Sequence, residues 1–276
     1  MVVDSITRLP ADARGAVVAC GSHGGVFPAW VAASAGVAGV IFNDAGMGRH
    51  SAGIAGVAWL DGLDIPACAV DYRSARIGDG ADTVASGIVT VANDAAARQG
   101  CLPGHSGEQV VRCMRSGEAT DGDDDDDDEE PDAPARIPTI GEGRARIRNS
   151  GHRAVWAIDS VSLARSEDRR AILVTGSHGA LLGGRADDGV LEADVFAAFF
   201  NDAGGGKDEA GFSRLPALEA RGVAAATVSC HSARIGDGRS TYETGVLSRL
   251  NEVARRLELR EGMGTREAVA RLVGLG

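Results

Sequence analysis

Long stretches of this sequence occur twice. The repeated blocks are GSHG, FNDAG and SARIGDG, found at 21–24 and 176–179, at 42–46 and 200–204, and at 74–80 and 232–238. The offset between the copies is 155 residues and becomes 158 after a three-residue insertion. Seven consecutive identities in register with two other blocks indicate an internal duplication. We therefore expect two versions of one unit, at 1–115 and 151–276, joined by residues 116–150.

Each half alternates short apolar runs with Ala-rich stretches separated by glycine turns, which is typical of βαβ units. The runs predict strands at 2–9, 16–20, 39–43, 67–71, 155–163, 171–175, 196–200 and 224–229. Helices are predicted at 29–35, 52–63, 83–98 and 245–259, and a capping box at 106–109 begins a further helix. The expected fold class is α/β, with two tandem homologous βαβ-type units, mainly parallel sheets and a pseudo-twofold axis.

The segment between the halves is strongly acidic. Residues 121–132 carry ten negative charges and no positive charge, so the net charge of −11 leaves only about −1 for the rest of the chain. Such a segment buries too little apolar surface to offset the entropy lost on ordering. It predicts a disordered linker at 116–150. An alternative is that the run folds back onto Arg144, Arg146 and Arg148, although surface ion pairs contribute little.

Composition argues against several classes of protein. Binding to nucleic-acid phosphates needs a clustered basic face, and only the stretch 144–153 is rich in arginine. No window reaches the ~18 apolar residues of a membrane span. Five scattered cysteines without CxxC spacing predict neither disulfides nor a zinc site. We expect a cytoplasmic protein without nucleic-acid or membrane partners, and leave a homo-oligomer open.

The three repeated blocks each follow a predicted strand. In parallel sheets, ligands collect at the carboxyl ends of the strands, so these turns should meet at one edge. Backbone geometry explains their glycines. It does not explain the polar side chains that recur with them, which are His23 and His178, Asn43 and Asn201, Asp44 and Asp202, Arg76 and Arg234, and Asp79 and Asp237. We therefore predict a functional site at that edge.

The side-chain chemistry suggests roles within this site. The predicted catalytic residues are His23, Ser74, Asp44, His178, Ser232, Asp202 and Cys230. The histidines would transfer protons, the serines would attack as nucleophiles and the aspartates would orient the histidines. Cys230 adjoins His231 in the second half alone and is an alternative nucleophile if its pKa is lowered.

Other residues in the repeated blocks are predicted to bind substrate. They are Ser22, Gly24, Asn43, Arg76, Asp79, Ser177, Gly179, Asn201, Arg234 and Asp237. A guanidinium would hold a carboxylate with two hydrogen bonds, and the GSHG amides would form an anion-binding nest. Two alternatives stay open: the arginines pair with nearby aspartates, or His23, Asp44 and Asp79 hold a metal ion.

These residues favour an enzyme that acts on a small anionic substrate without a cofactor. The leading hypothesis is a metal-independent hydrolase of an amide, cyclic amide or ester bond in a carboxylate-bearing molecule, with the GSHG amides stabilising the oxyanion. The alternatives are a lyase or isomerase that abstracts a proton next to a carboxylate, and a protein that binds small anions without turnover.

Overall fold

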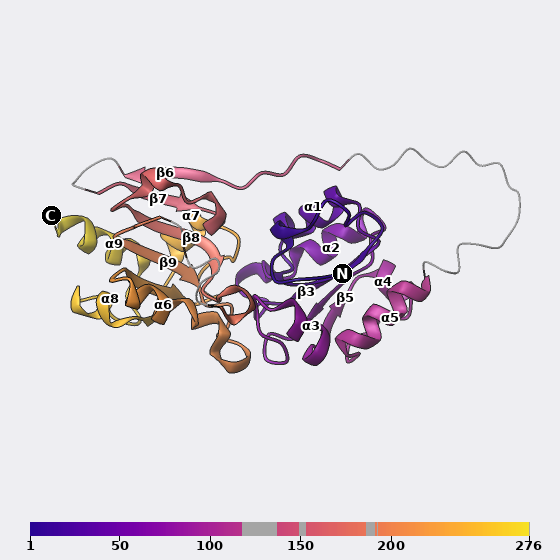
Figure 1. Ribbon diagram of the computed structural model, residues 1–276. Coiled ribbons are helices and arrows are strands. Elements are labelled where there is room, and N and C mark those ends of the chain that lie inside the picture. Colours follow the sequence, from indigo (N-terminus) through magenta and orange to yellow (C-terminus); the bar gives the residue numbers. More distant parts are fainter. Residues whose placement is uncertain (118–136, 149–152, 186–190, 192, 276) are drawn as a thin grey trace, which may run out of the picture.

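The computed structural model describes residues 1–117, 137–148, 153–185, 191 and 193–275. Within these ranges the chain is an α/β protein with two mixed sheets, one of five strands and one of six. Figure 1 shows each sheet with its own helices around it. No helix in this part of the chain combines the length and the apolar character needed to cross a membrane.

The first sheet has the strand order β1-β2-β3-β4-β5, in which β1 to β4 are parallel neighbours and β5 runs antiparallel to β4. Its strands are β1 (Val2–Val3), β2 (Val17–His23), β3 (Gly39–Asn43), β4 (Ala67–Val70) and β5 (Val89–Ala92). Its helices are α1 (Val26–Ala35), α2 (Ala55–Asp61), α3 (Gly80–Ser86), α4 (Asp94–Arg98) and α5 (Gly107–Gly117), with short 3-10 turns η1 (Ile6–Arg8) and η2 (Arg49–Ser51).

The second sheet has the order β11-β10-β9-β8-β7-β6. Its strands are β6 (Arg144–Arg148), β7 (Val155–Ile158), β8 (Ile172–His178), β9 (Ala197–Asn201), β10 (Ala224–Val228) and β11 (Leu247–Leu250). Its helices are α6 (Arg214–Ala220), α7 (Gly238–Thr244), α8 (Glu252–Arg256) and α9 (Thr265–Gly274), and its 3-10 turns are η3 (Val161–Leu163), η4 (Ser166–Asp168), η5 (Leu182–Gly184) and η6 (Lys207–Phe212). Strands β7 to β10 are parallel neighbours, whereas β6 and β11 are antiparallel to the strands they join.

Both sheets are buried on both faces, because their central strands are continuous apolar runs. One face of the first sheet packs on α1 and α2, and the other face packs on α5 through Val110 and Met114. In the second sheet α6 covers one face, and α8 and α9 cover the other. Each half therefore consists of three layers, with the parallel strands in the middle.

Two predicted helices are wrong. The range 83–98 contains the end of α3, strand β5 and helix α4, and the range 245–259 contains strand β11 and helix α8. The three consecutive β-branched residues Val89, Thr90 and Val91 favour a strand. Asn93 then caps α4, because its side chain accepts a hydrogen bond from the backbone N–H of Ala96 at 2.9 Å. The strands expected at 2–9 and 155–163 are shorter, since 3-10 turns follow β1 and β7.

The predicted linker is also wrong in part. Residues 144–148 form β6, which pairs antiparallel with β7. Arg144 makes a two-pronged ion pair with the buried Asp168, at 2.5 and 3.0 Å, and lies over the ring of Trp156. These contacts stabilise the strand by satisfying the guanidinium locally. The acidic run 121–132 lies outside the described residues.

Two of the turns that join the halves cross in opposite directions. The backbone N–H of Arg49, in the first half, donates to the carbonyl oxygen of Cys230 at 2.7 Å. The backbone N–H of Lys207, in the second half, donates to the carbonyl oxygen of Tyr72 at 2.8 Å. Beside them lies a small apolar cluster drawn from both halves, formed by Ala45, Ile77, Ala180, Ala203, Ala210 and Ile235. The contact therefore combines main-chain hydrogen bonds and small apolar side chains with ion pairs such as that of Lys207 with Asp82.

Candidate functional site

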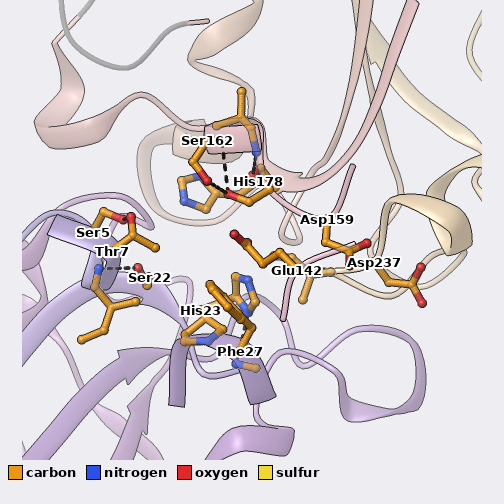
Figure 2. Close-up of a pocket in the computed structure, with 18 of the residues that line it drawn as sticks. Ser5, Thr7, Ser22, His23, Phe27, Glu142, Asp159, Ser162, His178 and Asp237 are labelled. Carbon is orange, nitrogen blue, oxygen red and sulfur yellow. Dashed lines mark hydrogen bonds between the residues drawn. The ribbon is translucent and has the colours of Figure 1, made fainter. Parts of the chain in front are cut away.

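A cavity of about 650 Å³ lies between the two halves. The first half contributes η1, the end of β2 and the start of α1, and the second half contributes the corresponding end of β8 and the turn before α7. Residues 140–142, just before β6, also line it. This volume is in the range of small-molecule sites. Figure 2 shows the side chains of both halves facing this space.

His23 and His178 occupy equivalent positions at the two strand ends, and both line the cavity. The Nδ1 atom of His23 accepts a hydrogen bond from the backbone N–H of Gly25 at 3.1 Å. The Nδ1 atom of His178 accepts one from Ala180 at 3.3 Å. Because Nδ1 is the acceptor, each neutral ring carries its proton on Nε2.

Burial keeps both imidazoles neutral. It lowers the pKa of His23 to about 4. The pKa of His178 falls to about 3, first because of burial and then because of the positive charge of Arg214 and the neighbouring His23. At neutral pH each ring is therefore an uncharged hydrogen-bond donor. A neutral imidazole of this kind can polarise a carbonyl oxygen.

Each histidine also reaches the glycine turn of the opposite half. A Cβ atom on Gly236 would lie 3.2 Å from Cε1 of His23, and one on Gly78 would lie 3.5 Å from Cε1 of His178. Within its own half, each of these glycines donates its N–H to the strand that carries the histidine, at 2.7–2.8 Å. The repeated GDG turns therefore hold the strand ends and leave room for the imidazoles.

Glu142 enters the cavity from the segment before β6. Burial raises the pKa of its carboxyl group to about 7, the neighbouring Asp159 raises it further, and hydrogen bonds from Ser160 and Ser162 oppose the shift. Figure 2 shows its side chain between His178 and His23. A carboxylate that titrates near neutral pH is suited to act as a general base.

Two pairs of hydroxyl groups face the cavity from equivalent turns. Ser5 and Thr7 lie 2.9 Å apart in the first half, and Ser160 and Ser162 lie 2.8 Å apart in the second. The predicted substrate-binding residues Ser22 and Ser177 fix these turns, because their hydroxyl oxygens accept hydrogen bonds from the backbone N–H groups of Ile6 and Val161, respectively, at 2.9 and 2.8 Å. Both also line the cavity.

The predicted nucleophiles Ser74 and Ser232 are not among the residues that line the cavity. The Ser74 hydroxyl donates to the carbonyl oxygen of Asp71 at 2.8 Å and accepts from the backbone N–H of Ile88 at 2.9 Å. Ser232 makes the same two contacts in its own half. These hydroxyl groups connect a turn to the strand that follows, and the structure does not bring them to the histidines in the cavity.

The repeated Asn-Asp pairs hold their own turns. Asn43 and Asn201 are completely buried, and each side chain joins two backbone groups of neighbouring turns. Asp44 accepts hydrogen bonds from the backbone N–H groups of Gly46 and Tyr72, and Asp202 accepts from Gly204 and Cys230. None of the four lines the cavity, so these carboxylates do not orient the imidazoles.

Cys230 is buried, and burial together with the nearby Asp202 raises the pKa of its thiol to about 12. A protonated thiol is a poor nucleophile. The adjacent His231 is exposed, and neither residue lines the cavity. The structure therefore gives Cys230 a packing role at the contact between the halves.

The two predicted anchor arginines differ. Arg76 does not line the cavity and lies among three aspartates, Asp79, Asp82 and Asp208, at 3.3–3.4 Å. Arg234 lines the cavity and pairs with Asp237 at 2.5 Å.

Asp79 and Asp237 also cap α3 and α7 by accepting hydrogen bonds from backbone N–H groups. The ion-pair alternative therefore describes both arginines, although Arg234 also faces the cavity.

The backbone amides of the GSHG turns are already engaged. Gly24 and Gly179 donate to the carbonyl oxygens of Asn43 and Asn201, at 3.0 and 2.8 Å. The expected nest of free N–H groups is therefore not formed by these two amides.

Several residues that line the cavity are not predicted from the sequence. Glu142 lies within the predicted linker. Arg214 aligns in sequence with Gly56 of the first half, so the repeat does not mark it. The block at 4–7 that matches 159–162 contains the two hydroxyl pairs, but its pattern predicts only strands. In the described part of the chain, no group of three or more His, Cys, Asp or Glu side chains is arranged to hold a metal ion. His23, Asp44 and Asp79 in particular do not converge.

Comparison with protein-family models, with curated proteins and with solved structures finds no match to this chain.

Proposed function

We propose that this protein is an acid–base enzyme, an isomerase or lyase that removes a proton from a carbon next to the carbonyl group of a small substrate. The observation that supports this proposal most is the combination of two neutral imidazole donors with one carboxylate of raised pKa in a single cavity. Groups whose environments push their pKa values apart are typical of acid–base active sites.

Glu142 takes the proton from the carbon in this reaction. The electron pair moves onto the carbonyl oxygen and forms an enolate, which is held by the Nε2–H groups of His23 and His178. The proton then returns to the same carbon or to a neighbouring one, or the electron pair expels a leaving group from the next carbon. Neither route needs a nucleophilic side chain, which agrees with the positions of Ser74 and Cys230 outside the cavity.

Hydrolysis of an amide, cyclic amide or ester is a second candidate, because the same donors suit a tetrahedral oxyanion. Glu142 would then activate a water molecule. This route also differs from the serine mechanism expected from the sequence. It predicts the net addition of one water molecule to the substrate, whereas the first route predicts exchange of carbon-bound hydrogen with solvent.

The test is proton exchange in D₂O. Small oxo acids and hydroxy acids are incubated with the protein, and carbon-bound deuterium is measured by NMR. We expect exchange with the wild type, and a loss of about 10²–10⁴-fold in Glu142→Gln, which removes the base. Glu108→Gln, at an exposed position on α5, is the matched control and should exchange at the wild-type rate.

Exchange that persists unchanged in Glu142→Gln contradicts the proposal. Net addition of water to the substrate without exchange favours hydrolysis. Ligand-raised melting without turnover favours the binding protein.

We also propose that the two halves descend from one duplicated unit with a mainly parallel core. Support comes from the matching strand order of β1 to β5 and β7 to β11. The repeated turns also follow equivalent strands in the two halves. Structural superposition of the halves tests this proposal, and a low agreement over these strands contradicts it.

A further inference from the structure

The two hydroxyl pairs have different surroundings. Ser160 and Ser162 lie close to the carboxyl group of Glu142, which enters from the segment before β6, and all three residues line the cavity. Ser5 and Thr7 form the equivalent pair in the first half and also line the cavity. The pair in the second half therefore lies beside a carboxyl group of the protein, whereas among the described residues of the first half no acidic side chain lines the cavity beside Ser5 and Thr7.

The charges of the cavity lining are divided between the halves. The acidic side chains that line it within the described residues are Glu142, Asp159 and Asp237, and all three belong to the second half or the segment before it, which also contributes Arg214 and Arg234. The lining residues of the first half include no acid, and Arg8 lies next to Thr7 among them. An incoming anion is therefore repelled less on the side of Ser5 and Thr7.

An apolar wall adjoins this side. Val26, Phe27 and Pro28, at the start of α1, line the same cavity. Figure 2 shows Phe27 with His23 on the first-half side, and Ser5 and Thr7 to one side of Glu142. A substrate with both a carboxylate and an apolar substituent would match these surfaces.

We propose that Ser5 and Thr7 form the carboxylate-binding subsite of this cavity, and that the substrate is an oxo acid with an apolar substituent. The carboxylate accepts hydrogen bonds from the two hydroxyl groups, which lie 2.9 Å apart at the cavity wall. The reacting carbon then lies towards Glu142, and the substituent lies against α1. This assignment of the substrate class rests on the proposed function.

Binding of an unreactive acid tests the subsite without any turnover. The probe is 3-phenylpropanoate, its uncharged isostere is 3-phenylpropanamide, and binding is measured by calorimetry. We expect the wild type to bind the acid at least tenfold more tightly than the amide. The double variant Ser5→Ala/Thr7→Val should lose at least tenfold in affinity for the acid, since hydrogen bonds to a charged group are lost.

Two variants serve as matched controls. Thr7→Ser keeps the hydroxyl group and should bind the acid as the wild type does. Ser160→Ala/Ser162→Ala changes the equivalent pair and should leave affinity for the acid within about twofold, while shifting the pH dependence of exchange. Circular dichroism and melting establish that each variant is folded.

Equal binding of acid and amide by the wild type overturns the proposal, as does unchanged binding by folded Ser5→Ala/Thr7→Val. Failure of the proposed function is a separate outcome. It would appear as a lack of deuterium exchange while the acid still binds in a manner that depends on Ser5 and Thr7.

Discussion

The two halves carry the same turns at their strand ends but build different walls around the cavity. The first half places the ten-residue helix α1 directly after His23. After His178, the second half has the short turn η5 instead, and its sheet gains the strand β6 with Glu142 just before it. The comparison shows which parts are shared and which are not: the imidazole donors are present twice, whereas the carboxylate is present once.

A single position illustrates how the walls differ. Gly56 in α2 aligns with Arg214 in α6. A Cβ atom on Gly56 would lie only 2.3 Å from the carbonyl oxygen of Gly25, so the absence of a side chain lets α1 pack closely. Arg214 is 1% exposed, lies over the ring of Phe200 and donates to the carbonyl oxygen of Ala180 at 2.8 Å. A shared backbone can therefore present an apolar helix on one side and a cation on the other.

Removing either imidazole should have the largest effect on turnover. We expect His23→Phe and His178→Phe each to lower the exchange rate by about 10²–10³-fold, because each removes one donor to the developing oxyanion. Deuterium incorporation by NMR provides the measurement. His231→Phe changes an exposed histidine and should have no effect. A loss in only one of the two cavity variants would show that the halves do not contribute equally.

Weakening the contact between the halves should have the next largest effect, on the free energy of unfolding. Lys207 reaches across to Asp82 at 2.8 Å, whereas the position equivalent to Asp82 in the second half is Ser240. Asp82→Ala leaves Lys207 and Arg76 without this carboxylate, so we expect unfolding free energy to fall by about 2–3 kcal/mol.

Ser240→Ala is the matched variant and should cost about 1 kcal/mol, because it removes no charge but only the neutral hydroxyl that accepts from the backbone N–H of Arg234 and contacts the Thr244 hydroxyl at 3.4 Å. Urea unfolding measures both. Equal losses would contradict the asymmetry of this contact.

The dependence of stability on pH offers a third comparison. The pKa of each cavity histidine is lower in the folded state, so the unfolded state binds more protons below pH 6.5, and stability falls with acidification by about 2 kcal/mol per imidazole down to pH 4.5. The pKa of Glu142 is raised to about 7, so its contribution has the opposite sign and declines as pH rises from 4.5 to 7.

These opposite signs give three distinct profiles in urea unfolding between pH 4.5 and 6.5. The wild type should lose stability on acidification, His178→Phe should lose little, and Glu142→Gln should lose more than the wild type. Parallel profiles for all three would contradict the assignment of neutral imidazoles and a protonated carboxyl group.

The smallest effect concerns one buried hydroxyl group. Thr175 in β8 is completely buried, and within the described residues its Oγ1 atom has no hydrogen-bond partner. At the equivalent position of β2, the Cys20 thiol donates to the carbonyl oxygen of Ile41. We expect Thr175→Val to raise unfolding free energy by about 1 kcal/mol, because it removes an unsatisfied polar group without changing shape. Thermal melting measures the gain, and a lower melting temperature would contradict it.

The sequence predicts the central strands of this protein better than the residues of its cavity. Apolar runs give the central strands, and β3 has the predicted bounds. The repeat also locates both histidines, because a polar residue that recurs after a strand needs a reason beyond backbone geometry. Ser74 recurs equally well, however, since a turn needs its hydroxyl group in both halves. Repetition alone does not separate these two reasons.

Glu142 could not be placed in the site from its neighbours in sequence. Its position depends on the path of β6, which is fixed by distant contacts such as that of Arg144 with Asp168. Its raised pKa depends on burial by residues of both halves. A cavity residue that lies outside all the repeated blocks is visible only once the chain is folded.

The crossed turns have a consequence for how ligands enter and leave. Because the N–H groups of Arg49 and Lys207 donate to the opposite half, a hinge motion that separated the halves would break main-chain hydrogen bonds at both crossings. Such opening would also separate the small apolar cluster between the halves, so these two amides should exchange with solvent more slowly than those of exposed turns. We therefore expect ligands to enter while the halves stay together.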